Sequence, residues 1–207
     1  MLKSTELRWF YSGTLPDTIA HWFRQDDLGE HLVPPETRED QYLVISECDY
    51  LNIKLRQNRL EIKCRQAELG KLQVSEQLAG KVEQWIKWMC EDPATERLIS
   101  ASQLTQGPWL RVQKERSQHK YQVLADSSLT TVPLNTSISQ GCTVEITQLK
   151  VESVAWWSLA LEAFGDDASR MHILQTVARW LSYTYPGAKL EIQNSCGYPQ
   201  WLSKLAK

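Results

Sequence analysis

The sequence lacks any apolar run close to the roughly 20 residues that an α-helix needs to cross a membrane. Its first residues, 1–6, also lack the continuous apolar stretch of a secretory signal peptide. These absences predict a cytoplasmic protein with no membrane partner. The hydrophobic content of 42% over 207 residues is ample for a core, and we expect one domain over residues 1–207.

The five cysteines form no CxxC pair and lie far apart along the chain. This spacing disfavours both a disulfide framework and a zinc ribbon, so we predict reduced thiols. The four histidines are equally scattered and show no metal-ligand spacing. We expect His21 and His172 on helices and His119 in a turn, in structural or exposed positions.

Neither sign of charge dominates, because 23 basic residues face 25 acidic ones and leave a formal net charge of -2. This balance counts against a nucleic-acid partner, and any use of positive charge must be local. The nine glycines are isolated, so there is no glycine-rich phosphate loop, and no nucleophile-elbow motif is present. A serine triad or a nucleotide-loop mechanism is therefore disfavoured.

Short β-prone segments recur along most of the chain, separated by polar residues. We predict strands over residues 6–12, 42–46, 50–56, 60–66, 109–118, 120–125, 143–148 and 156–163. A short final strand over 189–193 is left open. Gln57-Asn58 fits a tight hairpin turn, because asparagine tolerates a positive φ. Strands adjacent in sequence favour antiparallel pairing over βαβ crossovers, so the fold class is α+β.

Helices are expected over residues 17–23, 75–92 and from 166 or 167 to 185, with a terminal helical turn over 198–205. The second helix depends on four apolar residues at spacings of four, three and four, namely Leu78, Val82, Trp85 and Met89. That spacing is typical of one face of an amphipathic helix. Residues 26–40 are rich in charge and contain Pro34-Pro35, which predicts a mobile loop.

Basic residues occur at every second position on several predicted strands, and residues two apart in a strand share a face. Three such pairs are Lys54 with Arg56, Lys63 with Arg65, and Lys114 with Arg116. A charged strand face is usually exposed to solvent. Closure of the sheet into a barrel would instead turn this face inward, where clustered bases need a polyanion such as polyphosphate. Interleaved carboxylates would then suit a divalent metal.

The order of these motifs resembles the CYTH domain of the triphosphate tunnel metalloenzymes, which include thiamine triphosphatases, inorganic triphosphatases and class IV adenylate cyclases. The segments that carry the resemblance are Leu51-Asn52-Ile53-Lys54-Leu55-Arg56, Leu60-Glu61-Ile62-Lys63, Val112-Gln113-Lys114-Glu115-Arg116, the glutamates Glu145 and Glu162, and Cys196-Gly197-Tyr198-Pro199-Gln200-Trp201-Leu202. They span most of the chain. The resemblance implies an antiparallel eight-stranded sheet that closes into a tunnel-like barrel with flanking helices.

The sequence departs from this family at its hallmark Glu-x-Glu-x-Lys motif, where it has Glu6-Leu7-Arg8-Trp9-Phe10. Arg8 thus stands where the family has a metal-binding carboxylate, and Ala160 stands where a second strand carboxylate is expected. A carboxylate replaced by a cation changes the charge near a metal by two units, which lowers metal affinity. The departure leaves triphosphatase activity open.

The resemblance implies a basic tunnel that binds a phosphorylated small molecule: a nucleotide, tripolyphosphate or thiamine triphosphate. The predicted phosphate-binding residues are Lys54, Arg56, Lys63, Arg65, Lys114 and Arg116. The predicted ligands of a magnesium or manganese ion, which would support phosphoanhydride hydrolysis, are Glu6, Glu61, Glu145 and Glu162.

Three alternatives remain open at this point. The same fold could serve as a non-catalytic binding or interaction module whose cavity charges pair internally. Basic strands interleaved with aromatic residues also fit a binder of single-stranded nucleic acid. One ring of the Trp156-Trp157 pair could pack against a second subunit, so a homodimer is a further alternative.

Overall fold

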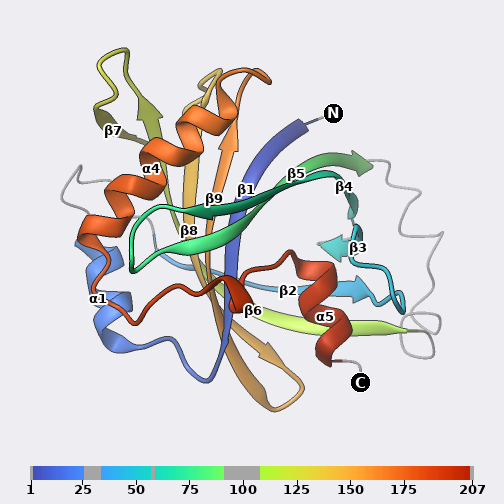
Figure 1. Cartoon of the computed structure of the whole chain (residues 1–207). Helices are drawn as coiled ribbons and strands as arrows, with labels where there is room; N and C mark the ends of the chain where they lie inside the picture. Colours follow the sequence, from blue (N-terminus) through green and yellow to red (C-terminus); the bar gives the residue numbers. More distant parts are fainter. Residues whose placement is uncertain (1, 26–33, 57–58, 91–107, 206–207) are drawn as a thin grey trace.

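The computed structural model describes residues 2–25, 34–56, 59–90 and 108–205 (Figure 1). Its strands are β1 (Leu2–Ser12), β2 (Glu36–Leu43), β3 (Leu51–Arg56), β4 (Arg59–Gln73), β5 (Ala79–Cys90), β6 (Trp109–Val123), β7 (Leu129–Val132), β8 (Gly141–Val151) and β9 (Val154–Phe164). Within these described residues, the helices α1 (Asp17–Arg24), α4 (Arg170–Thr184) and α5 (Tyr198–Leu205) flank the sheet, and a 3-10 turn covers Ile192–Asn194.

Eight of the strands form a closed antiparallel barrel in the order β2-β3-β4-β5-β1-β9-β8-β6, and β7 extends the sheet beyond β6. Closure depends on β2, which pairs with β3 on one side and with β6 on the other. The predicted α+β barrel with flanking helices is therefore confirmed. No described helix combines the length and the apolarity that a membrane span requires.

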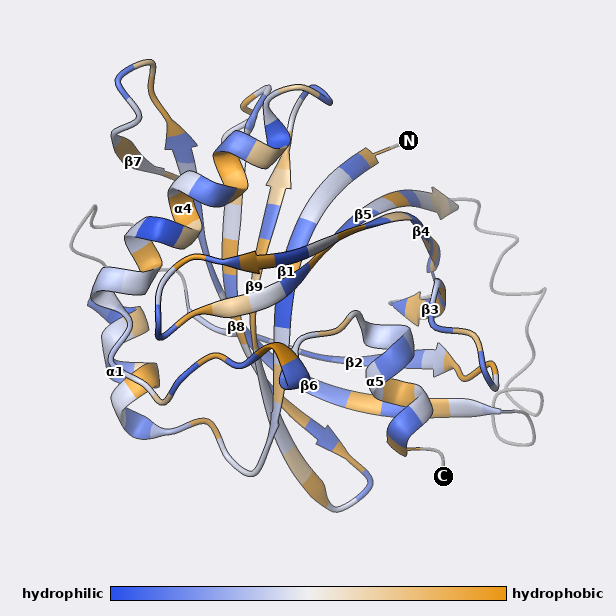
Figure 2. Ribbon diagram, in the orientation of Figure 1, coloured by the Kyte–Doolittle hydropathy of each residue, from blue (hydrophilic) through white to orange (hydrophobic). Residues whose placement is uncertain are grey.

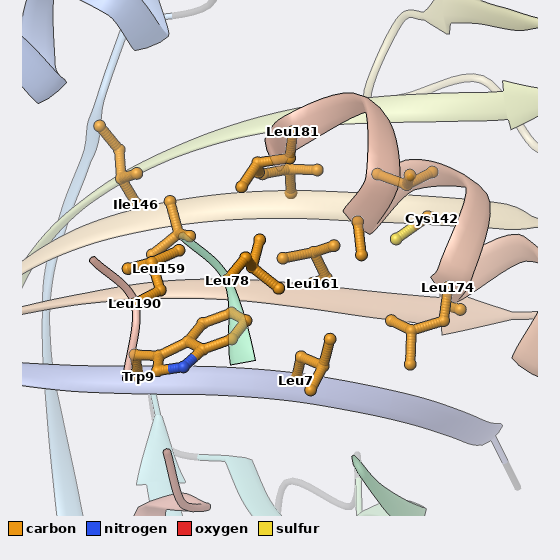
Figure 3. Close-up of a cluster of buried hydrophobic side chains, with 14 of the residues drawn as sticks. Leu7, Trp9, Leu78, Cys142, Ile146, Leu159, Leu161, Leu174, Leu181 and Leu190 are labelled. Carbon is orange, nitrogen blue, oxygen red and sulfur yellow. The ribbon is translucent and has the colours of Figure 1, made fainter. Parts of the chain in front are cut away.

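The main hydrophobic core lies outside the barrel, beneath α4 (Figure 3). On β1, Leu7 and Trp9 project toward this core, and Leu174 and Leu181 of α4 belong to the same cluster. Figure 2 shows hydrophilic and hydrophobic residues alternating along the barrel strands. Because side chains alternate between the two faces of a strand, the other half of these residues points into the barrel.

A second apolar cluster packs α5 against the barrel. The Phe10 ring stacks on Trp201 with centroids 4.5 Å apart, and Tyr198 meets Phe10 edge-on at 5.1 Å. The backbone N–H of Cys196 donates to the carbonyl of Arg8 at 3.0 Å. A Cβ on Gly197 would lie 2.7 Å from the Trp85 ring, so only glycine allows this close approach. These contacts place the segment before α5 against the barrel interior.

The helix predicted over residues 75–92 is wrong, because residues Ala79–Cys90 form β5, while residues 91–92 lie outside the described part of the chain. Apolar residues occur on both faces of the strand: Leu78 and Val82 belong to the outer core, while Trp85 lines the barrel interior. Burial of both faces produced a spacing of three and four residues without a helix. Tertiary packing here overrides the periodicity.

The hairpin predicted over residues 109–125 is also wrong, because β6 runs unbroken from Trp109 to Val123. His119 lies in this strand rather than in a turn, and its Nε2 is 2.8 Å from the carbonyl oxygen of Phe23. The predicted turn at His119 followed Gln118, which faces the polar barrel interior. Polarity at this position reflects the cavity and not a change of chain direction.

The segment predicted as a loop over residues 26–40 contains the first half of β2, so the strand predicted over 42–46 is displaced. Residues 26–33 lie outside the described part of the chain.

The strand left open over 189–193 is a single bridge at Leu190 followed by the 3-10 turn. The predicted helix at 166 begins at Arg170 instead, after a turn in which the Asp166 carboxylate accepts from the Ser169 N–H at 2.8 Å.

Both tryptophans of the Trp156-Trp157 pair pack within the chain. Trp157 is buried in the main core and stacks on Tyr11 with centroids 4.7 Å apart. Trp156 meets Trp201 edge-on at 5.9 Å in the second cluster. Alternation sends the two rings to opposite faces of β9, and the molecule covers each face.

Candidate anion-binding site

A polar cavity of about 110 Å³ lies inside the barrel. Side chains from all eight barrel strands line it, together with the segment Gly197 to Pro199. Among the described residues, eight basic and four acidic side chains reach it. The basic ones are Arg8, Arg38, Lys54, Arg56, Lys63, Lys87, Lys114 and Arg116. The acidic ones are Glu6, Glu61, Glu145 and Glu162.

Most residues predicted to form a site therefore meet in one place. All four predicted glutamates line the cavity, and so do five of the six predicted bases. The exception is Arg65, whose guanidinium binds Asp49 at 2.9 Å and Glu83 at 2.9 Å. The predicted residues meet because alternate side chains of a strand share one face. When the sheet closes into a barrel, the charged face of every strand points into the interior.

The sequence interpretation missed several residues of the site. Arg38, Asp40 and Tyr42 alternate along β2, yet the neighbouring prolines and charges led to a loop assignment for Arg38 and Asp40, and Tyr42 was predicted only as the start of a strand. Lys87 was hidden in the segment predicted as a helix. The signal that could have found the β2 residues is their two-residue spacing, which is the same as that of the basic pairs.

Asp40 is fully buried at the centre of four bases. Its carboxylate oxygens lie 3.1 Å from Lys114 Nζ, 3.2 Å from Arg56 Nε, 3.3 Å from Arg38 Nε and 3.7 Å from Lys54 Nζ. We call these four bases and Asp40 the basic cluster. Burial by itself would raise the pKa of Asp40, but the surrounding cations hold it far below its usual range.

Glu61 supports the same side of the cavity. Its carboxylate lies 3.0 Å from Lys54 Nζ, 3.2 Å from Arg56 Nη1 and 3.3 Å from Lys87 Nζ. Burial opposes its ionisation, but these cations prevail and lower the pKa of Glu61 to about 2. Asp40 and Glu61 therefore each contact three or more cations, so no base of this group has a carboxylate to itself.

Lys114 is the most enclosed base of the basic cluster, since 3% of its side chain is exposed. Its ammonium lies 4.1 Å from the ring centre of Tyr198 and 4.8 Å from that of Tyr42, and it donates to the Tyr42 hydroxyl. Burial lowers the pKa of Lys114 to about 7, although Asp40 opposes this effect. A nearby anion would therefore favour its protonation.

Arg8 crosses the cavity toward β8. Its Nη1 donates to Glu145 at 3.0 Å and to Ser158 Oγ at 3.3 Å, and its guanidinium lies 4.9 Å from the Tyr198 ring centre. Arg116 contacts the other oxygen of Glu145 at 3.5 Å. Burial would raise the pKa of Glu145, but Arg8 and then Arg116 hold it well below the usual range.

Glu6 and Glu162 are directly paired across β1 and β9, and we call them the acidic pair. One base serves both: Lys63 Nζ contacts Glu6 and lies 3.8 Å from Glu162. The Ser4 hydroxyl also donates to Glu6. Burial, and then the charge of Glu162, raise the pKa of Glu6 above its usual value. The acidic pair thus has two carboxylates and one base, whereas the basic cluster has four bases and one carboxylate.

Three of the four predicted magnesium or manganese ligands are already in contact with a base. Such ions need carboxylate oxygens that are free to coordinate them. Glu145 binds Arg8, Glu61 binds Lys54, and Glu6 binds Lys63. The described residues contain no group of three or more histidine, cysteine, aspartate or glutamate side chains spaced to hold a metal.

No protein-family model and no curated protein matches the sequence. Solved structures that resemble it include the PH1819 protein from Pyrococcus horikoshii OT3, with 13% identity over 98% of both chains and a TM-score of 0.48. Another is a Bacillus halodurans protein described as a "putative adenylate cyclase", with 10% identity over 90% of this chain and 94% of that one and a TM-score of 0.42. Similarity of this degree identifies no ligand.

Proposed function

We propose that this protein binds a small phosphorylated anion inside the barrel, without a metal ion and without hydrolysing it. The observation that carries the proposal is the basic cluster, in which four bases surround one buried carboxylate. Glu61 and Glu145 compensate part of the positive charge, yet eight basic side chains line the cavity against four glutamates, or five carboxylates when the buried Asp40 is counted. A polyanion would complete the neutralisation.

The donors of the cavity suit phosphate oxygens. Arg56 and Arg116 carry planar guanidinium groups, which bind phosphate through two parallel hydrogen bonds. About a fifth of each of these side chains is exposed, at 19% and 20%, so they can meet a ligand that enters. The buried Nε of Arg116 has no hydrogen-bond partner and remains available as a donor.

The cavity volume limits the size of the anion. A typical pocket for an organic ligand measures roughly 300–1,000 Å³. The barrel cavity measures about 110 Å³ and can hold a chain of a few phosphoryl groups, but not a complete nucleotide. Among the predicted ligands, tripolyphosphate therefore fits best, and a larger molecule would need its organic part outside the barrel.

The proposal omits hydrolysis because of how the carboxylates are paired. A metal-dependent reaction needs acidic residues that hold the ion and position a water molecule. Glu61, Glu145 and Glu6 each contact a base instead, and Arg8 occupies the position of a metal-binding carboxylate in the family that the sequence resembles. Metal-dependent hydrolysis stays a prediction of the sequence resemblance. The following experiment distinguishes it from metal-free binding of the anion.

The test is thermal unfolding with tripolyphosphate, first in EDTA and then with magnesium or manganese. A ligand at 100 times its Kd stabilises the native state by about 2.7 kcal/mol, so we expect a Tm increase of several degrees in EDTA. A shift that requires metal, together with phosphate release, would favour hydrolysis. No shift under either condition would overturn the proposal in favour of a scaffold whose cavity charges pair internally.

Two arginine variants show where the anion binds. Arg56→Gln removes a cavity guanidinium while Asp40 keeps three other bases, and we expect at least tenfold weaker binding. Arg111→Gln is the matched control, because Arg111 lies on β6 with 61% of its side chain exposed. Equal losses in both variants would show that binding occurs on the surface and not in the barrel.

A further inference from the structure

The cavity is electrically polarised across the barrel. The basic cluster belongs to β2, β3 and β6, whereas the acidic pair belongs to β1 and β9. In the closed strand order, β1 lies four strands from β2 in either direction, so the two groups face each other across the interior. A ligand that spans the cavity meets positive charge at one end and negative charge at the other.

At the negative end, oxygen acceptors exceed the available donors. Lys63 is the one described base in salt-bridge contact with either member of the acidic pair, and its contact with Glu162 is long at 3.8 Å. The Glu162 side chain is 42% exposed and can receive a new partner. Asn52 adds an independent signal in the same cavity: it pairs in register with Lys63, it is buried in the cavity wall, and its Oδ1 has no hydrogen-bond partner. A buried acceptor without a partner is costly, which points to a donor on the ligand.

We propose that the ligand is a phosphorylated amine. Its phosphoryl group lies at the basic cluster and its ammonium group lies at the acidic pair. This inference rests on the proposed function, since it assigns the end of the ligand that the phosphate site does not bind. An ammonium has three donors and no acceptor, which matches a surface of two carboxylates and an amide oxygen.

Lys63 connects the two ends. Its ammonium now lies between Glu6 and Glu162, and its strand neighbour in the register is Asn52. A phosphoryl group that attracts Lys63 would leave the carboxylates to the ammonium of the ligand. The cavity of about 110 Å³ restricts this ligand to a short aliphatic amine.

The experiment compares O-phosphoethanolamine with ethyl phosphate by titration calorimetry on the full chain. The two compounds share the phosphate ester, and only the first has an ammonium group. We expect wild-type protein to bind phosphoethanolamine about tenfold more tightly, because a hydrogen bond to a charged group has this effect. Glu162→Gln should reduce the preference to about twofold, because it removes one of the two carboxylates that would meet the ammonium group.

A control variant and a third ligand separate the outcomes. Glu115→Gln alters an exposed carboxylate on β6 and should keep the tenfold preference. If wild-type protein binds tripolyphosphate but shows no preference for the amine, or if Glu162→Gln keeps the full preference, this inference is wrong while the proposed function stands. If none of the three phosphates binds, both are wrong.

Discussion

The basic cluster and the acidic pair belong to one cavity, but their charges are compensated in opposite ways. Asp40 has four cations within 4 Å, and its pKa is far below the usual range. Glu6 shares one lysine with Glu162, and its pKa is raised. Burial opposes the ionised carboxylate on both sides, but the surrounding bases outweigh it at Asp40 and do not at Glu6. The number of nearby bases, and not burial, decides the difference.

The largest effect should follow from Asp40→Asn, which leaves four buried bases around a neutral side chain. We expect the free energy of unfolding to fall by about 3–5 kcal/mol, as when one partner of a buried ion pair is removed. Urea unfolding at pH 7 measures this change. The control is Glu39→Gln, one residue earlier on β2 with 39% of its side chain exposed, which should change stability by less than ~0.5 kcal/mol. A loss below ~1 kcal/mol for Asp40→Asn would contradict the role of Asp40.

Acid should destabilise the protein through the same carboxylates. The pKa of Glu61 is about 2 in the folded state, against an ordinary value of 4.5. Its ion pairs therefore stabilise the fold above about pH 4.5, and this contribution of about 3 kcal/mol disappears as the pH falls toward 2. Urea unfolding of the wild type and of Glu61→Gln between pH 2 and 6 tests this, because the variant should lose less stability on acidification. Parallel pH profiles would show that Glu61 is not the group that titrates.

The smallest effect is expected for Glu6→Gln in the acidic pair. Burial and Glu162 already oppose the negative charge of Glu6, so its removal relieves repulsion while it weakens the contact with Lys63. These changes oppose each other, and we expect stability at pH 7 to change by less than about 1 kcal/mol. Chemical denaturation alongside Asp40→Asn makes the comparison direct. A loss as large as that of Asp40→Asn would mean that both sides of the cavity depend on their carboxylates equally.

The strands that carry the basic pairs could be predicted because the information is local. Lys54 and Arg56 share a face whenever residues 51–56 form a strand, and the same holds for Lys114 and Arg116. Where the local pattern was ambiguous, the prediction was wrong. β5 buries both of its faces and mimicked a helix, and polar residues inside β6 mimicked a turn. In β6, the polar barrel interior accounts for polar residues such as Gln118 in the middle of a strand.

For β3, β4 and the first part of β6, the sequence by itself determined which charges share a face, since a period of two residues depends on backbone geometry alone. Only the tertiary structure decided which charges meet. The pairing of β2 with β6 brings Asp40 into the centre of the bases, and the pairing of β1 with β9 sets Glu6 opposite Glu162. These contacts join residues far apart in the chain, and their register depends on closure of the whole barrel, which no short segment specifies.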